Sequence, residues 1–351
     1  MTLAALVQHL TFALLLTLLS AATARAMIAF PIIDHPNHRS AHVNPTPRGG
    51  GLGAVLAFML GMLVLYQVAD FARIAERPFI GVILAAAAIA AVALADDVRA
   101  LPAWLRLAAQ LAAAVVAVAM GLVLTHLSLP WIGAVELGWL GPPITLLWIV
   151  GCTNAVNFMD GLDGLVGGTL VIASATLAAI AASQEGWFVY AAALFLTAGF
   201  LGFLPFNLHP ARIFMGDVGS QFAGFMLAVL AIAAARFDTN EVSFLIVPLL
   251  LFGLLFDAAF TLARRAATGA RVSEAHRTHL YQMAQRSGMP VQAVAAVHWG
   301  FALFHVGLAV LFLRLSPALK PLVVLPALAV QLLWLDLVRR RARRAGLSWR
   351  G

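Results

Sequence analysis

Long apolar stretches recur along the 351-residue chain, and they constrain its fold more than any other feature. About 20 consecutive apolar residues form one helical membrane span, because a helix satisfies its backbone hydrogen bonds without water. The stretches lie at 3–22, 51–69, 79–94, 104–126, 144–156, 165–182, 187–205, 222–235, 242–262, 291–313 and 322–338. The sequence therefore predicts an all-α polytopic integral membrane protein with about 11 transmembrane helices, in which residues 1–351 form a single membrane-embedded domain.

The charge pattern orients these spans. Charged residues make up 11% of the chain and hydrophobic residues 62%, whereas a soluble domain has about 25% charged and 45–50% apolar residues. Counting connections from an external N-terminus places most of the 22 Lys and Arg residues on one side, including the basic tail at 339–351. Basic loops stay in the cytoplasm, so that side is predicted to be cytoplasmic, and the net charge of +7 reflects topology rather than nucleic-acid binding.

All the unusual polar clusters fall on the predicted cytoplasmic side. They lie at residues 34–48, 96–99, 154–163, 207–220 and 271–282. A transporter needs polar groups near the membrane midplane that both faces can reach. A one-sided arrangement instead favours an enzyme that uses a cytosolic substrate, with a cytoplasmic-face active site. A cation-coupled membrane transporter is the alternative from a different class.

Two adjacent carboxylates, Asp96 and Asp97, close the third apolar stretch. Neighbouring residues on a helix point about 100° apart, so the two do not share one helical face. Both can still reach a cation at a helix end, and Mg²⁺ favours hard oxygen ligands of this kind. The alternative is a solvated helix terminus with Arg99 as the partner.

Four polar residues spaced by three follow the fifth stretch. They are Asn154, Asn157, Asp160 and Asp163. On a continuous helix this spacing drifts by about 60° per step, so the side chains would wrap a concave surface. Gly161 and Gly164 are expected to break the helix and to let the backbone approach a ligand closely. The alternative is a polar loop that caps the span.

A glycine-rich loop at 206–220 follows the seventh stretch. Gly216 and Gly219 flank Asp217, which predicts an exposed turn before a helix that begins near Ser220. A helix N-terminus favours anions, so phosphate oxygens could sit beside a cation bound to Asp217. Phe214 is a candidate stacking platform for a base, and an aromatic anchor at the membrane interface is the alternative.

The cytoplasmic loop at 265–290 carries a dense set of donors for phosphate. His276 and His279 are predicted to lie one helical turn apart, and Arg277 stands beside them. A histidine pair with this spacing can also bind zinc, but no Cys or carboxylate at ligand spacing accompanies it. Phosphate binding is therefore the favoured interpretation.

The first cytoplasmic loop adds further basic residues. Arg39, His42 and Arg48 could bind phosphate there, and a rigid basic linker at an anionic membrane surface is the alternative. Asp257, in the ninth stretch, is predicted to form a structural ion pair with Arg264 or Arg265. The tail at 339–351 is predicted to anchor to anionic lipid.

Taken in order, these clusters resemble those of the bacterial polyprenyl-phosphate N-acetylhexosamine-1-phosphate transferases, glycosyltransferase family 4, over about residues 34–282. The motifs are Asp96-Asp97 with Leu101-Pro102, Asn154-x-x-Asn157-x-x-Asp160-Gly-x-Asp163-Gly-Leu165, and Phe214-Met-Gly-Asp217-x-Gly-Ser220. The resemblance implies a phosphoglycosyl transferase of the bacterial inner (cytoplasmic) membrane. It would transfer a sugar-1-phosphate from a UDP-sugar to undecaprenyl phosphate and release UMP, with Mg²⁺ or Mn²⁺ as the metal.

The predicted site residues combine these motifs with the polar clusters. The catalytic candidates are Asp96, Asp97, Asp160, Asp163 and His279. The substrate-binding candidates are Asn154, Asn157, Asn207, Phe214, His276, Arg277 and Arg48. The resemblance implies that Phe214 stacks on uracil and that Asn207 also holds uridine. The metal candidates are Asp217 and Asp97.

One motif bears on the choice of sugar. His276-Arg-Thr-His279-Leu-Tyr281-Gln282 resembles the branch that initiates O-antigen, lipopolysaccharide or other surface glycans more than the three-histidine branch that transfers a peptide-bearing muramyl sugar. The expected partners are a UDP-N-acetylhexosamine, undecaprenyl phosphate and membrane lipids, with no nucleic acid and with a homodimer left open. A phospho-MurNAc-pentapeptide transferase is the alternative within the class.

Overall fold

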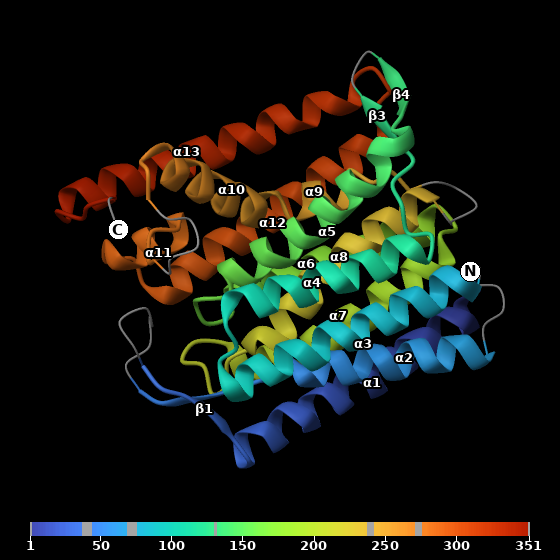
Figure 1. Cartoon of the computed structure of the whole chain (residues 1–351), viewed down its shortest axis with the longest axis horizontal. Coiled ribbons are helices and arrows are strands. Elements are labelled where there is room, and N and C mark those ends of the chain that lie inside the picture. The colour runs from blue at the N-terminus through green and yellow to red at the C-terminus, as the bar shows by residue number, and fades with distance from the viewer. Residues whose placement is uncertain are drawn as a thin grey trace.

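The computed structural model describes residues 2–36, 44–68, 76–129, 132–236, 242–270 and 276–349, which form a bundle of long helices running side by side (Figure 1). The helices are α1 (Leu3–Ala29), α2 (Leu52–Val68), α3 (Glu76–Arg99), α4 (Ala103–Ala119), α5 (Gly141–Met159), α6 (Leu165–Ser183), α7 (Trp187–Asn207), α8 (Gly216–Arg236), α9 (Ile246–Leu250), α10 (Phe252–Ala267), α11 (Leu280–Arg286), α12 (Val291–Arg314) and α13 (Val324–Arg344). Single 3-10 turns, η2 (Gly138–Leu140) and η3 (Lys320–Val323), lead into α5 and α13. The all-α membrane architecture is confirmed.

Eight helices within the described ranges are long and apolar enough to cross a membrane, as expected for a multi-pass membrane protein. They are α1, α3, α5, α6, α7, α8, α12 and α13. Helices α2 and α4 are apolar but shorter, at 17 residues each. The predicted span at 242–262 is divided between α9 and α10 at Leu251, so the number of eleven stays a prediction.

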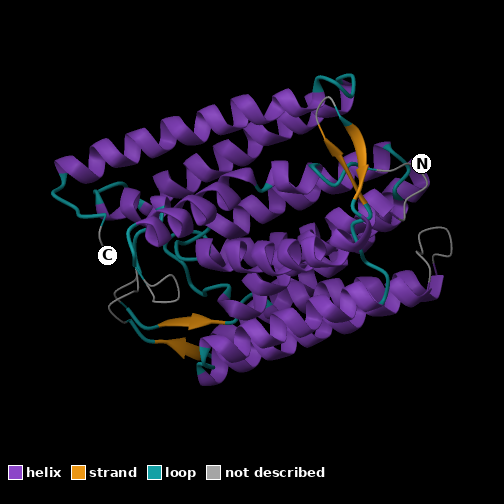
Figure 2. Ribbon diagram, turned by 45° about the horizontal axis from the view of Figure 1, so that its top comes forward, coloured by secondary structure: helices purple, strands orange, loops and turns teal. Residues whose placement is uncertain are grey.

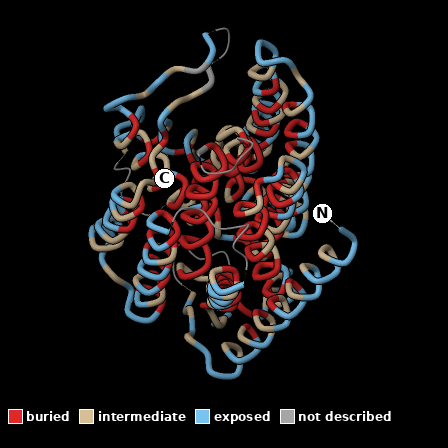
Figure 3. Tube along the Cα trace, turned by 90° about the vertical axis from the view of Figure 1, so that its right-hand side faces the viewer, coloured by how far each residue is buried: buried red, intermediate tan, exposed pale blue. Residues whose placement is uncertain are grey.

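Helix α8 forms the centre of the bundle. All of its most apolar segment is buried, against 17% of that segment in α1 and 28% in α13, and Figure 3 shows the buried chain gathered in the middle of the molecule. Helices α3 and α5 pack against α8. A Cβ added at Gly224 of α8 would lie 2.8 Å from the Cα of Thr153 in α5, so a small residue lets the two backbones approach closely. Side chains on the first turn of α8 therefore stand on the most deeply buried of the eight long helices.

Two short hairpins mark the opposite ends of the bundle (Figure 2). Strand β1 (Ile32–Asp34) pairs antiparallel with β2 (Thr46–Arg48), and β3 (His126–Leu129) pairs antiparallel with β4 (Gly133–Glu136). The β1–β2 hairpin lies at the end where α1, α3, α5 and α13 finish (Figure 1). The predicted polar clusters come together at this end.

Candidate active site

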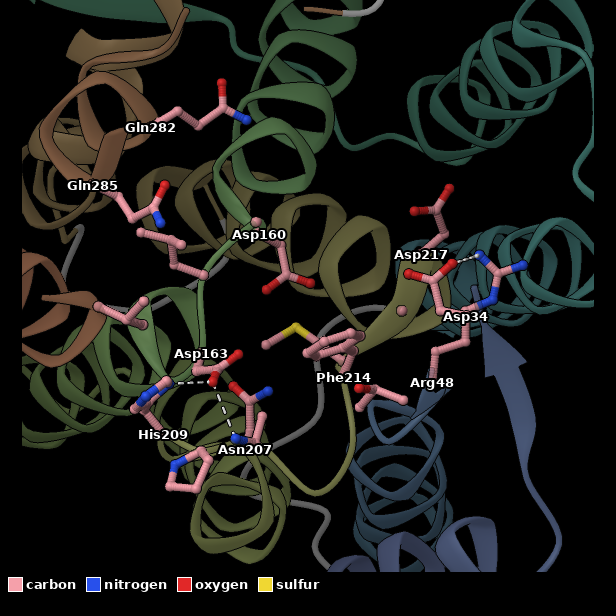
Figure 4. Close-up of a pocket in the computed structure, with 18 of the residues that line it drawn as sticks. Asp34, Arg48, Asp160, Asp163, Asn207, His209, Phe214, Asp217, Gln282 and Gln285 are labelled. Carbon is pink, nitrogen blue, oxygen red and sulfur yellow. Dashed lines mark hydrogen bonds and ion pairs between the residues drawn. The ribbon is translucent and has the colours of Figure 1, made fainter. Parts of the chain in front are cut away.

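A cavity of about 490 Å³ opens at the β1–β2 end of the bundle. Its walls come from β2, the end of α3, the α5–α6 turn, the α7–α8 loop and α11 (Figure 4). The predicted residues that line it are Arg48, Asp97, Asn157, Asp160, Asp163, Asn207, Phe214, Asp217 and Arg277. Four other predicted residues, Asp96, Asn154, His276 and His279, lie behind these walls. The structure thus brings together most of a site whose members are far apart in sequence.

Asp97 joins α3 to the N-terminus of α8. Its Oδ1 accepts a hydrogen bond from the Asp217 amide at 2.9 Å, and its Oδ2 accepts one from the Val218 amide at 3.0 Å. These amides have no partner inside the helix, so the carboxylate caps it. The prediction that α8 begins near Ser220 is wrong, because capping by Asp97 lets the helix start at Gly216 and places Asp217 in its first turn.

Gly216 makes this junction sterically feasible. Its φ is +75°, a conformation that side chains rarely adopt. A Cβ at this position would lie 2.6 Å from the Asp97 Oδ2 and 2.9 Å from the Gly49 amide nitrogen. Glycine is therefore required both for the backbone turn and for the approach of the Asp97 carboxylate.

The Asp217 carboxylate is oriented by three side chains. Its Oδ1 accepts from the Asn157 amide at 3.0 Å, and its Oδ2 accepts from Gln221 at 3.0 Å and from Arg106 at 3.3 Å. Hydrogen bonds to an ionised carboxylate are about twice as strong as neutral ones. The position of Asp217 is therefore fixed from α4, α5 and α8 together.

Arg106, on α4, also holds Asp96. Its Nη1 lies 3.2 Å from the Asp96 Oδ2, so one guanidinium bridges the carboxylates of Asp96 and Asp217. Asp96 also accepts a hydrogen bond from the Leu101 amide. The expected alternative, a solvated terminus paired with Arg99, is wrong, because Asp96 is 6% exposed and the packing of α4 supplies Arg106.

Asn154 points away from the cavity, into the bundle. Its amide donates to the Gln110 Oε1 at 2.6 Å and to the Val150 carbonyl. The Gln110 amide donates to the Gln221 Oε1 at 3.0 Å, and Gln221 donates to Asp217. Because α5 stays helical through this segment, Asn154 and Asn157 face different neighbours. Asn154 thus takes part in a buried carboxamide chain that ends on Asp217.

The turn between α5 and α6 presents Asp160 and Asp163. Helix α5 ends at Met159, and Gly164 has a φ of +72°, so the predicted break is confirmed. The Asp163 Oδ2 accepts from the Ala211 amide at 3.0 Å and pairs with the His209 Nδ1 at 2.7 Å. The predicted concave helical surface is therefore built from a helix end and a turn.

Asp160 differs from the other carboxylates of the cavity. Within the described part of the chain its side chain forms no hydrogen bond or ion pair, and it points into the cavity (Figure 4). Burial, together with the negative charges of Asp217, Asp97 and Asp163, raises the pKa of Asp160 to about 8. An acidic group in this environment favours a nearby cation.

The donor set fits a hard divalent cation that shares its coordination with a substrate. Five carboxylates line one cavity. Asp34 pairs with Arg48, and the other four are Asp97, Asp160, Asp163 and Asp217. Among the residues that the structure describes, no three His, Cys, Asp or Glu side chains converge closely enough to hold a metal by themselves. Mg²⁺ commonly binds through one or two carboxylates, with waters and substrate phosphates as its remaining ligands.

The His276–His279 segment is an extended approach to α11. The prediction that the two histidines lie one helical turn apart is wrong, because helix α11 begins only at Leu280. The His279 Nδ1 lies 3.2 Å from the Asp257 Oδ1, and the two imidazole rings stack with centroids 5.0 Å apart. Burial lowers the pKa of His276 to about 4, with the charges of His279 and two arginines contributing. His276 is therefore neutral at pH 7 and offers a phosphate less than the sequence suggested.

Asp257 anchors the His276–His279 segment where it enters α11. Besides His279, its carboxylate accepts from the Leu280 amide at 2.9 Å and the Tyr281 amide at 3.0 Å. It therefore caps α11, in place of the ion pair that was predicted with Arg264 or Arg265. The Arg264 guanidinium donates instead to the carbonyls of Thr278 and Trp349.

Asn207 braces the wall of the cavity between the α5–α6 turn and the α7–α8 loop. Its Oδ1 accepts from the Gly164 amide at 3.0 Å, and its Nδ2 donates to the Ile213 carbonyl at 3.0 Å. Both ends of this 3% exposed carboxamide are thus bonded to protein backbone. The Phe214 amide donates to the Pro47 carbonyl, which joins the α7–α8 loop to β2 and puts Phe214 in the wall.

Arg48 brings a cation to the cavity from β2. Its guanidinium pairs with Asp34 at 3.8 Å and with Asp97 at 3.9 Å, and it donates to the Asp97 carbonyl. Two other basic candidates of this loop, Arg39 and His42, lie outside the described residues. The described part of the first loop therefore contributes Arg48 beside the acidic cluster.

Several residues of the site were missed by the sequence predictions. They are Arg106, Gln110, Gln221, His209, Gln282 and Gln285. A signal for two of them was present, since Arg106 and Gln110 are polar residues four apart within an apolar stretch and so share one helical face. Gln282 and Gln285 face the cavity from α11 (Figure 4).

Comparison with known proteins identifies the family. The model of glycosyl transferase family 4 matches residues 79–235. A probable undecaprenyl-phosphate N-acetylglucosaminyl 1-phosphate transferase of Bacillus subtilis is 33% identical over 269 residues, which cover 76% of this chain and 73% of that protein. A decaprenyl-phosphate N-acetylglucosaminephosphotransferase of Mycobacterium leprae is 32% identical, with coverage of 71% and 69%.

The similarity also extends to a second branch. A phospho-N-acetylmuramoyl-pentapeptide-transferase of Lactobacillus gasseri is 40% identical over 139 residues, which cover 39% of this chain and 44% of that protein. The N-acetylglucosamine-1-phosphate transferases therefore match over a much longer segment. By the identity and the coverage of these matches, the chain belongs to glycosyl transferase family 4.

Proposed function

We propose that the protein transfers an N-acetylhexosamine-1-phosphate from a UDP-sugar to undecaprenyl phosphate, giving an undecaprenyl-diphosphate sugar and UMP. The observation that carries this proposal is the cavity that five carboxylates line together with Arg48 and Arg277. Acidic groups that favour a cation, beside arginines that bind phosphate, suit the transfer of a phosphorylated sugar. The names of the long-matching relatives support a polyprenyl phosphate acceptor.

The chemistry balances without a strong base. An oxygen of the lipid phosphate forms a bond to the β-phosphorus, and the bond from that phosphorus to the bridging oxygen breaks with its electron pair going to UMP. A phosphate monoester has a second pKa of about 6, so the acceptor is largely dianionic at pH 7. Because both oxygens of Asp97 accept backbone hydrogen bonds, we assign Asp97 to organising the site rather than to removing a proton.

The main requirement is to bring two anions together. A bound Mg²⁺ would supply charge neutralisation for the crowded phosphate oxygens, and Asp217 and Asp97 are the residues we assign to hold it. Asn157 and Gln221 orient the Asp217 carboxylate. Arg106 lies between Asp96 and Asp217 on a helix whose outer face is exposed, which suits contact with the lipid phosphate.

The proposal includes a location and a role. Since the basic loops lie at the same end as the cavity, we infer that the site faces the cytoplasm of a bacterial inner membrane. The departure from a three-histidine loop at His276–His279 supports a simple amino sugar and initiation of O-antigen or another surface glycan. Transfer of a muramyl-pentapeptide phosphate is the second candidate, which the shorter match to that branch supports.

A donor panel tests the reaction. The purified protein with undecaprenyl phosphate and Mg²⁺ should release UMP from UDP-GlcNAc or a related amino sugar and not from UDP-MurNAc-pentapeptide. The reverse preference would establish the second candidate. Release from neither donor, together with solute flux in proteoliposomes that persists when Asp96, Asp97 and Asp217 are all replaced, would instead indicate a transporter.

A single substitution tests the assignment of Asp217. Asp217→Asn keeps the size of the side chain and removes the charge, so we expect UMP release to fall by at least about 1,000-fold. The variant should elute from a size-exclusion column as the parent does. Turnover within about tenfold of the parent would remove Asp217 from the metal site.

A further inference from the structure

The end of the described chain turns back against the loop that leads into the site. Helix α13 stops at Arg344, where Gly346 adopts a φ of +66°. The Gly346 amide bonds to the Arg343 carbonyl and the Leu347 amide bonds to the Ala342 carbonyl, the pattern in which a glycine ends a helix and reverses the chain. The sequence of the helix end therefore directs Leu347–Trp349 back toward α10.

Arg264 of α10 connects this returning segment to the histidine loop. Its Nη1 donates to the Trp349 carbonyl at 2.6 Å, and its guanidinium carbon lies 4.9 Å from the centre of the Trp349 ring. Its Nη2 donates to the Thr278 carbonyl at 2.9 Å. The Trp349 carbonyl and indole face hold the Arg264 guanidinium on one side. The guanidinium is therefore pre-organised to bind the Thr278 carbonyl on its other side.

Thr278 lies between the groups that face the cavity and the groups that anchor α11. Arg277, its neighbour, lines the cavity, and His279 on the other side bonds to Asp257. Within α11, the Tyr281 hydroxyl donates to the Phe158 carbonyl at 3.0 Å, two residues before Asp160. A displacement at Thr278 would therefore reach both Arg277 and the turn that carries Asp160.

We propose that Leu347–Trp349 and Arg264 form a C-terminal clip that positions the Arg277 side of the site from behind. Trp349 and Arg264 do not line the cavity, so they are positioning residues and not catalytic ones. The loop is not helical before Leu280, so side-chain contacts hold it, with Arg286 on the Arg277 carbonyl and Asp257 on His279 beside the clip. Its kinetic consequence rests on the proposed transfer from a UDP-sugar, while its structural consequence does not.

The test compares the full chain with a form that ends at Gly346 and with Trp349→Ala. Hydrogen exchange in the detergent-purified protein should rise in peptides covering 276–286, with α8 unchanged. In the transfer assay we expect the KM for the UDP-sugar to rise by about tenfold while kcat stays within about twofold, the result of losing binding without losing chemistry.

Matched variants separate the clip from general effects. Trp349→Phe keeps an aromatic face for Arg264 and should restore most of the KM. Trp139→Ala removes a tryptophan that is 82% exposed at the opposite end and should change neither measurement. Gly346→Ala should mimic the truncation, and Gly346→Asn should be milder, because asparagine tolerates the positive φ and the space around Gly346 is open.

Three results would overturn the clip. Unchanged exchange at 276–286 in the truncated form would show that nothing is positioned there. A fall in kcat and a rise in KM, together with faster exchange throughout α8, would show that the segment stabilises the whole protein and does not position the loop. Unchanged KM despite faster exchange at 276–286 would show that the position of the loop does not affect binding of the UDP-sugar. If the parent protein releases no UMP from any UDP-sugar, the proposed function fails, and the exchange experiment still decides whether the clip holds the loop.

Discussion

Two walls of the same cavity are held by different means. The core-held wall consists of Asp97 and Asp217, which sit at the junction of α3 with the buried helix α8. The loop-held wall consists of Arg277, Gln282 and Gln285, which stand on or beside the seven-residue helix α11. The first is fixed by backbone amides and a buried carboxamide chain, and the second by Asp257, Tyr281 and the C-terminal clip.

The difference teaches how the two walls can serve one reaction. Charge stabilisation requires groups that do not reorganise during the reaction, which the junction with α8 provides. Recognition of a donor tolerates a wall that adjusts. Binding residues often lie on loops, which are more mobile than the scaffold that carries them. Damage to the core-held wall should therefore lower kcat, whereas damage to the loop-held wall should raise KM.

After that of Asp217→Asn, the largest effect is expected at Gly216. Gly216→Ala puts a Cβ 2.6 Å from the Asp97 Oδ2 at a φ of +75°, so the junction must open, at a cost of about 2–3 kcal/mol. We expect kcat to fall by at least about 100-fold, because small misplacements of reacting groups have effects of this size. Gly300→Ala, on α12 with open space around it, should be neutral or slightly stabilising. Full activity of Gly216→Ala would contradict a rigid core-held wall.

A smaller effect on the same wall is expected from the carboxamide chain. Gln110→Leu and Gln221→Leu each leave buried polar partners unsatisfied, which should cost about 1–3 kcal/mol and lower kcat by roughly tenfold. In the double variant the losses should be less than additive, with a coupling of about 1 kcal/mol or more. Simple additivity in thermal unfolding and UMP release would show that the chain does not act as a unit.

Gln331→Leu supplies the matched control for that experiment. Gln331 is 1% exposed on α13, and its Nε2 has no hydrogen-bond partner among the described residues. Removing a buried amide that lacks a partner is close to neutral or stabilising. We therefore expect normal kcat and KM from this variant. Normal kinetics would show that the losses in Gln110→Leu and Gln221→Leu come from breaking the carboxamide chain and not from replacing a buried glutamine.

A substitution in the loop-held wall should change the KM for the UDP-sugar. Tyr281→Phe removes the hydrogen bond to the Phe158 carbonyl, worth about 1 kcal/mol, and we expect the KM for the UDP-sugar to rise about threefold with kcat nearly unchanged. Tyr190→Phe removes a comparable hydrogen bond to His9 at the opposite end of the bundle and should leave KM unchanged. A fall in kcat for Tyr281→Phe would show that the two walls are not separable.

The sequence predicted much of the architecture, because membrane spans and glycine breaks are encoded locally. The apolar stretches located the long helices, and Gly161 and Gly164 located the turn after α5. Polar residues at the predicted cytoplasmic ends of the spans also located most of the cavity walls. These features depend on neighbouring residues, so no knowledge of packing was needed.

The parts that failed depend on contacts between distant helices. The start of α8 at Gly216 follows from capping by Asp97, and the pairing of Asp96 with Arg106 follows from how α4 packs. His279 was expected to face phosphate, but Asp257 of α10 holds it. In each case the deciding partner is supplied by another element, which spacing along the chain does not reveal.

The smallest effect is expected at Asp160, in the turn that Tyr281 braces. The pKa of Asp160, about 8, lies well above the value of an aspartate in an unfolded chain. Between these two values the folded protein holds a proton on Asp160 that the unfolded chain has lost. This contribution to stability is complete below about pH 4 and disappears as the pH rises through about 8. Without divalent cations, the melting temperature should therefore fall by a few degrees between about pH 6 and pH 9, and Asp160→Asn should flatten that slope.

Added Mg²⁺ sharpens the same measurement. A cation in the cavity favours the ionised form of Asp160, so Mg²⁺ should raise the melting temperature more at about pH 9 than at about pH 6. Asp163→Asn is the matched control, because the Asp163 carboxylate already bonds to His209 and to the Ala211 amide. An equal pH slope in the parent and Asp160→Asn would mean that the Asp160 carboxylate does not hold a proton in this pH range, and the contrast between partnered and unpartnered acids in the cavity would be lost.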